Sequence, residues 1–326
     1  MAQQVLMFHK AYARIAEALS TRVAEVEAVL WDTDGSLTLD GKAVSAADVA
    51  PVAAWFSGDV LGGPALGQIA QTVSMLPSIR WIQSANAGLD HPAYANLKGR
   101  DIRFSKSSAQ SIPIAEYTLA YALEHVQDLA VRRAAQAQGR WQTHRFDELW
   151  RSNWLIVGYG HIGRNVAIRA KAFDCHTVVV RQSPHADEYA DEVISMDRMA
   201  QFLPAADVIV LACPATDATR GMVSTDFLAA LKPSALLVNV ARGALVDEAA
   251  LLESLDQGRP ARAVLDVFEK EPLPSASPLW SHPRVTVTAH TSNAGSGTRG
   301  RGDELFLSNL ERFLRDETPT DLVDFG

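Results

Sequence analysis

The sequence predicts an α/β fold made of two doubly wound, parallel-sheet domains. The first observation is length, because 326 residues are too many for one ordinary hydrophobic core and suit two domains. The second is order: short apolar runs alternate with helical patterns, which implies right-handed crossovers and parallel sheets. The third is an interruption, since a polar segment over 139–152 separates one alternating series from a second.

The first series begins at the N-terminus. Its apolar runs predict four strands, over 5–8, 27–31, 49–56 and 80–84. Between the first two, the segment 10–23 spaces Ile15, Ala18 and Leu19 on one face of a helix. A long helix is expected over 114–137, which is rich in Ala, Leu, Glu and Arg, and Pro113 occupies the first-turn position that tolerates proline.

The second series has the rhythm of a Rossmann-type dinucleotide fold. A final helix, over about 303–315, follows a loose segment at 291–302 and could pack on either domain. The expected strands, most of them separated by helical patterns, are 154–157, 177–181, 208–212, 235–239, 263–266 and 285–288.

The composition narrows the class of protein. A hydrophobic fraction of 48% and a charged fraction of 21% are typical of a globular chain. Two cysteines form no disulfide framework and no Cys/His cluster, so we expect no metal and a reducing compartment. Residues 1–8 lack the features of a signal peptide, and no apolar stretch is long enough for a membrane span. We therefore expect a cytoplasmic protein with no membrane partner.

The charge of the chain bears on its partners. A net charge of −8 argues against nucleic acid, which normally binds a basic face. It permits a small anionic substrate, because a few arginines can set the potential inside a cleft.

A glycine-rich turn follows the strand expected at 154–157. In the segment GYGHIG, Gly158 permits the tight turn, Gly160 lets the backbone approach a pyrophosphate, and Gly163 lets helix and strand pack closely. A lone GxGxxG is weak, but here strand, turn and helix occur in the order that the motif requires. The residues assigned to cofactor binding in this turn are Gly158, Gly160, His161, Ile162 and Gly163.

The next strand end predicts which dinucleotide binds. NAD-specific sites usually carry Asp or Glu there, to accept hydrogen bonds from the ribose. This chain has Arg181, Gln182 and Ser183 instead. A cation pairs with a 2′-phosphate, and Ser183 can donate a further hydrogen bond. We therefore expect NADP(H) to be preferred, with NAD(H) possible; the alternative is that Arg181 only ends the strand in solvent.

Three chemically useful residues follow later strands. Arg242 follows the strand at 235–239, Glu271 lies in the loop after 263–266, and His290 follows 285–288. Ligands of open α/β sheets bind at the carboxyl ends of strands, so the three side chains are expected to converge. Each alone could be an ordinary surface cation, loop carboxylate or strand-end histidine. Their joint occurrence after a dinucleotide turn favours a catalytic set.

The sequence resembles a known family over nearly its whole length. The matching stretches are 158–163, 213–219, 239–247, 265–272 and the His290 segment. Their order and spacing are similar to the D-isomer-specific 2-hydroxyacid dehydrogenases, and most similar to NADPH-dependent glyoxylate/hydroxypyruvate reductases.

The resemblance implies the domain organisation. We expect a Rossmann-type dinucleotide-binding domain at 111–292. A flavodoxin-like substrate domain would combine 1–110 with 293–326, with an interdomain cleft. Homodimers are common in the family.

The resemblance also implies an oxidoreductase that transfers a hydride between NAD(P)H and a small 2-keto acid or D-2-hydroxy acid. Arg242 would hold the substrate carboxylate through its planar fork. His290 would donate a proton to the carbonyl oxygen, and Glu271 would orient His290 and favour its charged form. Reduction would then gain at acidic pH and oxidation at alkaline pH.

Other positions carry weaker expectations. Asp266 would contact the nicotinamide amide or cap its loop, and Thr118 would lie near the nicotinamide or only pack. The backbone of Ala87 and Gly88 would meet the substrate carboxylate. The remaining expected contacts are Cys213, Pro214, Thr219 and Val240 beside the cofactor, and Trp55 and Phe56 either lining the substrate cleft or packing in the core.

The sequence departs from the family pattern around the histidine. Ala289 stands where proline is more common, and Ser292 and Asn293 replace small apolar residues. The first domain resembles the family least. The resemblance therefore predicts the reaction better than it predicts the side chain of the substrate. Two alternatives follow: a dehydrogenase for a bulkier D-2-hydroxy acid, and a non-enzymatic NAD(P)(H)-sensing binding protein, which the intact Arg242, Glu271 and His290 set argues against.

Overall fold

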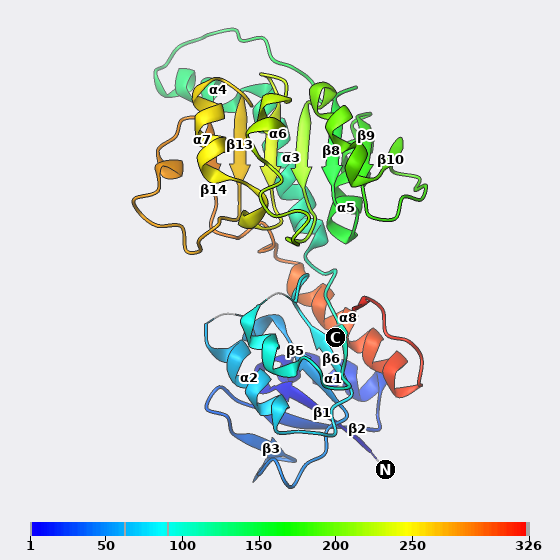
Figure 1. Cartoon of the computed structure of the whole chain (residues 1–326). Helices are drawn as coiled ribbons and strands as arrows, with labels where there is room; N and C mark the ends of the chain where they lie inside the picture. The colour runs from blue at the N-terminus through cyan, green and yellow to red at the C-terminus, as the bar shows by residue number, and fades with distance from the viewer. Residues whose placement is uncertain (1, 62, 90, 324–326) are drawn as a thin grey trace. The chain divides into compact units, whose positions relative to one another are not determined.

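The chain divides into two compact units, each built on a mainly parallel sheet. The computed structural model describes residues 2–61, 63–89 and 91–323. Unit 1 comprises Met1–Gln110 and Ser296–Gly326, and unit 2 comprises Ser111–Gly295 (Figure 1). Two parallel-sheet α/β units confirm the predicted fold class.

The sheet of unit 1 has the strand order β15-β7-β6-β5-β1-β2-β3-β4. Strands β7 to β2 of this order are parallel, whereas β15, β3 and β4 pair antiparallel at the edges. The parallel part, β2-β1-β5-β6-β7, has the flavodoxin-like order. The strands are β1 (Gln3–Phe8), β2 (Val26–Trp31), β3 (Leu37–Leu39), β4 (Lys42–Val44), β5 (Ala53–Phe56), β6 (Trp81–Ser84), β7 (Arg103–Ser105) and β15 (Leu322–Val323).

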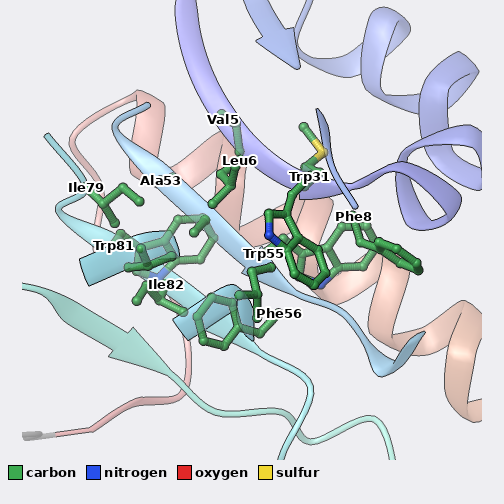
Figure 2. Close-up of a cluster of buried hydrophobic side chains, with 14 of the residues drawn as sticks. Val5, Leu6, Phe8, Trp31, Ala53, Trp55, Phe56, Ile79, Trp81 and Ile82 are labelled. Carbon is green, nitrogen blue, oxygen red and sulfur yellow. The ribbon is translucent and has the colours of Figure 1, made fainter. Parts of the chain in front are cut away.

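Aromatic rings fill the core of unit 1. Phe306, on the C-terminal helix α8 (Thr298–Leu314), stacks on Trp55 with ring centroids 4.2 Å apart and on Trp81 at 6.2 Å. Figure 2 shows Trp55 and Trp81 among the strand residues of this cluster. The final helix therefore belongs to the core of unit 1, a question that the sequence left open. The other helices of this unit are α1 (His9–Arg22) and α2 (Ala65–Ser74).

The sheet of unit 2 has seven strands, all parallel, in the order β10-β9-β8-β11-β12-β13-β14. This is the Rossmann order with one added strand, and its topological switch point lies between β8 and β11. The strands are β8 (Asn153–Val157), β9 (His176–Val180), β10 (Glu192–Ile194), β11 (Val208–Leu211), β12 (Leu236–Asn239), β13 (Arg262–Leu265) and β14 (Val285–Val287).

Both faces of this sheet are buried, which explains why its strands are continuous apolar runs. On β8, Trp154 and Ile156 join one core cluster, with α3 and α5, whereas Leu155 and Val157 join another, with α6 and α7. The helices of unit 2 are α3 (Ser111–Gln127), α4 (Leu129–Ala137), α5 (His161–Ala172), α6 (Thr225–Ala229) and α7 (Glu248–Asp256).

The structure corrects the sequence-based elements at several places. The helix expected over 114–137 is two helices, because Asp128 has a φ of +47°, in the left-handed region. The expected strand over 49–56 is only β5, and the short strands β3, β4, β7, β10 and β15 were not predicted. No helix within the described ranges is long and apolar enough to cross a membrane.

Candidate active site

The functional segments predicted in unit 2 all follow carboxyl ends of strands in one parallel sheet. The glycine turn follows β8, Arg181 follows β9, and Cys213 follows β11. Arg242, Asp266 and His290 follow β12, β13 and β14. Since parallel strands end at the same edge, these residues share the edge at which open α/β sheets bind ligands.

The glycine turn has the geometry of a dinucleotide site. Gly158 has a φ of +100°, and a Cβ there would lie 2.6 Å from backbone atoms of Ala212 and Cys213. A Cβ on Gly163 would lie 2.0 Å from the carbonyl oxygen of Gly158, so only glycine permits this contact. A Cβ on Gly160 would meet nothing within 4 Å. Packing within the protein does not require Gly160, and the position lies at the start of α5, where Rossmann-type folds bind a pyrophosphate.

The residues after β9 place cationic and polar groups together. Nη1 of Arg181 lies 2.7 Å from Nε2 of His185, and Nδ1 of His185 lies 3.2 Å from the carbonyl oxygen of Ser183. The guanidinium lies over the ring of Tyr159, 5.9 Å from its centroid. Gln182 and Ser183 are exposed. These groups suit a phosphate, and no acidic residue stands at this strand end.

The segment after β11 is a closed loop. The Thr219 hydroxyl donates to the carbonyl oxygen of Pro214 over 2.8 Å and accepts from the N–H of Thr216 over 2.8 Å. Cys213, at the start of the loop, is buried, and burial raises the pKa of its thiol to about 11. Cys213 is therefore a protonated packing residue at neutral pH.

The turn that carries Arg242 is built by Asn239, at the end of β12. The Asn239 side chain accepts from the N–H of Ala241 over 3.1 Å and donates to the carbonyl oxygen of Arg242 over 2.9 Å. A Cβ on Gly243 would lie 1.8 Å from the carbonyl carbon of Phe268. The Arg242 turn thus packs directly on the loop that leads to Glu271. Val240, in the same turn, is buried.

His290 and Glu271 form a hydrogen-bonded pair. Nδ1 of His290 lies 2.8 Å from Oε2 of Glu271, and the side chains are 46% and 36% exposed. Oε1 of Glu271 accepts from the N–H of Phe268 over 3.0 Å, which fixes the carboxylate. Because Nδ1 is engaged, Nε2 is the nitrogen that can exchange a proton with a substrate.

Asp266 holds the turn that presents His290. Its carboxylate is fully buried and accepts from the Thr288 hydroxyl (2.6 Å) and the N–H groups of Thr291 (2.8 Å) and Ser292 (3.0 Å). Its carbonyl oxygen accepts from the N–H of His290 over 2.8 Å. The φ of His290 is +53°, so these bonds stabilise a backbone conformation that few side chains adopt. A contact between Asp266 and a nicotinamide amide stays a prediction.

Tyr117 extends this network into α3. Its hydroxyl lies 2.7 Å from the hydroxyl of Thr288, and burial raises its pKa above the usual range. The neighbouring Thr118 is buried, and its hydroxyl donates to the carbonyl oxygen of Ile114 over 2.9 Å. This bond agrees with the alternative that Thr118 only packs within α3. A contact between Thr118 and a nicotinamide stays a prediction.

Trp55 and Phe56 pack as the core alternative expects. Both rings lie in the core of unit 1, with exposures of 2% and 0%. Trp55 stacks on Phe306, and Phe56 stacks on Tyr94 with centroids 6.1 Å apart. A substrate contact of either ring stays a prediction. Ala87 and Gly88 are half-buried in the segment after β6, and their role stays a prediction.

Sequence reasoning missed Tyr117, Asn239 and His185. Asn239 ends a strand one turn before Arg242, a signal that could have suggested a capping role. Tyr117 and His185 have no such local signal, because their partners lie on other segments or across a loop. Within the described ranges, no group of three or more His, Cys, Asp or Glu side chains could hold a metal ion.

Comparisons with known proteins agree with this geometry. Residues 119–292, more than half of the chain, match the family described as D-isomer specific 2-hydroxyacid dehydrogenase, NAD binding domain. Glyoxylate/hydroxypyruvate reductase A of Serratia proteamaculans is 33% identical over 211 residues, which cover 64% of this chain and 66% of the relative.

Solved structures are similar over the whole chain. A D-isomer specific 2-hydroxyacid dehydrogenase family protein from Aeromonas salmonicida is 26% identical, with a TM-score of 0.80 and 100% of both chains covered. A D-isomer specific 2-hydroxyacid dehydrogenase from Xanthobacter autotrophicus Py2, solved in complex with NADPH and MES, is 24% identical. Its TM-score is 0.79, with 100% of this chain and 99% of that chain covered, and it shares the fold.

Proposed function

The chain belongs to the D-isomer-specific 2-hydroxyacid dehydrogenase family of NAD(P)-dependent oxidoreductases, and we propose that it reduces a small 2-keto acid, glyoxylate or hydroxypyruvate, with NADPH. The observation that carries the proposal is the 2.8 Å bond between His290 and Glu271 at the ligand-binding edge of the unit 2 sheet. Unit 2 binds the dinucleotide in this proposal, and unit 1 belongs to the substrate domain.

His290 is the proposed acid and base. A reduced nicotinamide, when bound, supplies a hydride for the carbonyl carbon of the acid. Nε2 of His290 donates the proton that the carbonyl oxygen then requires, and takes it back in the oxidation. Glu271 receives Nδ1–H, which fixes the orientation of the ring and stabilises the imidazolium electrostatically.

Arg242 is the proposed carboxylate anchor. A planar guanidinium can donate two parallel hydrogen bonds to a carboxylate, which sets the orientation of the keto acid. The capped turn at Asn239 and the contact of Gly243 with Phe268 support this role, because they place the Arg242 turn against the Glu271 loop. Ala87 and Gly88 remain proposed backbone contacts of the same carboxylate.

Arg181 and Ser183 support a preference for NADPH. Their positions after β9 correspond to the place where a ribose 2′-phosphate lies in such folds. The Xanthobacter relative was solved with NADPH, in line with this preference. The residues after the Gly158 turn and the start of α5 would hold the pyrophosphate.

Steady-state reduction of glyoxylate, hydroxypyruvate, pyruvate and phenylpyruvate, each with NADPH and NADH, tests the function. We expect the highest kcat/KM for one of the first two acids with NADPH. The variants R242K and H290Q should each lower kcat/KM by about 100-fold, the first mainly through KM and the second through kcat. Faster turnover of phenylpyruvate would favour the bulkier-acid alternative, and turnover of no acid despite dinucleotide binding would refute the reductase.

We also propose a homodimer formed through unit 2. The segment after α4 exposes three aromatic side chains: Trp141 is 100% exposed, Phe146 49% and Trp150 53%. Three large aromatic side chains exposed in one segment make it the candidate association surface in this proposal. Light scattering after gel filtration should give twice the chain mass of 35.3 kDa, and W141S should shift the protein toward monomer. A monomeric wild-type protein at micromolar concentration would contradict the proposal.

A further inference from the structure

We infer that His185 is a further binding residue for the 2′-phosphate of the cofactor, and that it takes up a proton when this phosphate binds. The inference rests on the proposed preference for NADPH and adds a residue and a proton to it. His185 lies four residues after Arg181 in an exposed loop, and it belongs to no sequence motif. The loop brings its ring back to the guanidinium.

The hydrogen bonds define the protonation state of His185. A carbonyl oxygen only accepts, so the ring nitrogen 3.2 Å from Ser183 O, which is Nδ1, carries the hydrogen. A guanidinium only donates, so the nitrogen 2.7 Å from Arg181 Nη1, which is Nε2, presents its lone pair. The ring is therefore neutral in this arrangement, with its basic nitrogen directed at Arg181.

The charged groups around the loop leave Arg181 available for an anion. Asp187 accepts from the Tyr159 hydroxyl (2.8 Å), the N–H of Tyr189 (3.0 Å) and Nε of Arg164 (3.1 Å). Burial acts to raise the pKa of Asp187, but these hydrogen bonds outweigh it and lower the pKa.

Glu188 also pairs with Arg164, over 3.3 Å. Asp187 and Glu188 are thus paired with Arg164, and Asp191, at the end of the loop, pairs with Lys171 over 2.8 Å. In the described part of the chain, the side chain that hydrogen-bonds Arg181 is His185.

A phosphate monoester changes this balance. Its oxygens only accept hydrogen bonds, and at pH 8 it is a dianion, because its second pKa is about 6. The N–H groups of Arg181 would turn from His185 to the phosphate. The unprotonated Nε2 would then face a negative oxygen, unless it binds a proton from solvent and becomes a donor. Binding therefore couples one phosphate to one proton on Nε2, with no covalent bond made or broken.

Titration calorimetry with adenosine 2′,5′-bisphosphate and with ADP tests this without turnover. The measurements are made at pH 8 in buffers of different ionisation enthalpy, which report the protons taken up. We expect wild-type protein to take up a proton with the bisphosphate but not with ADP. The variant H185Q should abolish this uptake and weaken the bisphosphate about threefold to tenfold, as expected for one exposed charge-assisted bond, with ADP unchanged.

Two further variants separate the possible failures. H176Q, at the start of β9 and away from the strand end, should behave as wild type. If H185Q keeps both proton uptake and affinity while R181Q loses the preference for the bisphosphate, the His185 inference is wrong and the NADPH preference stands. If wild type binds the bisphosphate no better than ADP, the preference itself fails. Inorganic phosphate should bind at least 100-fold more weakly; equal binding would overturn the assignment to the cofactor.

Discussion

Replacing Asp266 by asparagine tests whether a buried carboxylate holds the turn that presents His290. The carboxylate has three donors, and two of them, the Thr288 hydroxyl and the N–H of Thr291, bond to the same oxygen. The amide oxygen of asparagine can still accept those two. Its NH2 group then faces the N–H of Ser292, a donor against a donor.

The magnitude follows from these contacts. An unsatisfied buried N–H costs about 1–3 kcal/mol. The two remaining bonds also weaken, because charge-assisted bonds are roughly twice as strong as neutral ones. Together D266N should favour local opening of the His290 turn by about 2–4 kcal/mol. Displacement of a catalytic group by about 1 Å lowers rates roughly 100-fold, so kcat/KM should fall by at least that factor.

Hydrogen exchange followed by mass spectrometry measures the opening directly. Peptides that span 288–292 should exchange about 30-fold to 1,000-fold faster in D266N, since 1.4 kcal/mol corresponds to a factor of ten. The matched control is D247N: Asp247 caps α7 through the N–H of Ala250 at 3.0 Å, is exposed, and asparagine caps equally well. A large loss of kcat/KM without faster exchange in D266N would refute the positioning role and point to a direct cofactor contact.

Three more predictions follow from the site. G163A should destabilise unit 2 by about 1–3 kcal/mol or more, because its Cβ meets Gly158 O at 2.0 Å; G160A should keep stability in urea and lose affinity for ADP. E271Q should lower kcat/KM for reduction about 100-fold, whereas E269Q, at an exposed neighbour, should change it less than threefold; equal losses would contradict the pairing with His290. Burial disfavours the Cys213 thiolate, so at pH 8 only about a thousandth is ionised. Its alkylation by iodoacetamide should rise about tenfold per pH unit up to pH 11, and rapid labelling at pH 7 in folded protein would contradict the burial.

The regular part of the fold could be predicted because burial on both faces of the unit 2 sheet makes its strands continuous apolar runs. Short edge strands could not be predicted, because a strand of three residues, such as β10, is too short to show a periodic pattern. The break at Asp128 also escaped prediction. The residues on both sides favour helix, and the left-handed conformation of one residue leaves no strong mark in the sequence.

The residues of the candidate site that could be predicted are those that follow the strands of the unit 2 sheet. Arg242, Glu271 and His290 could be chosen because a residue after a parallel strand lies at the ligand edge whatever its neighbours are. Trp55 could not be placed, because an aromatic residue in a fully buried strand projects to either face of the sheet. Its partner, Phe306, comes from a helix about 250 residues later.

The return of α8 to unit 1 has a consequence for synthesis of the chain. Unit 2 is continuous from Ser111 to Gly295, so it can fold on the ribosome as soon as it emerges. Unit 1 begins to emerge first but must wait for Phe306, whose ring covers Trp55 and Trp81. A nascent or truncated chain that ends before α8 exposes two large indole rings, and such chains are expected to aggregate or bind chaperones although their dinucleotide unit is complete.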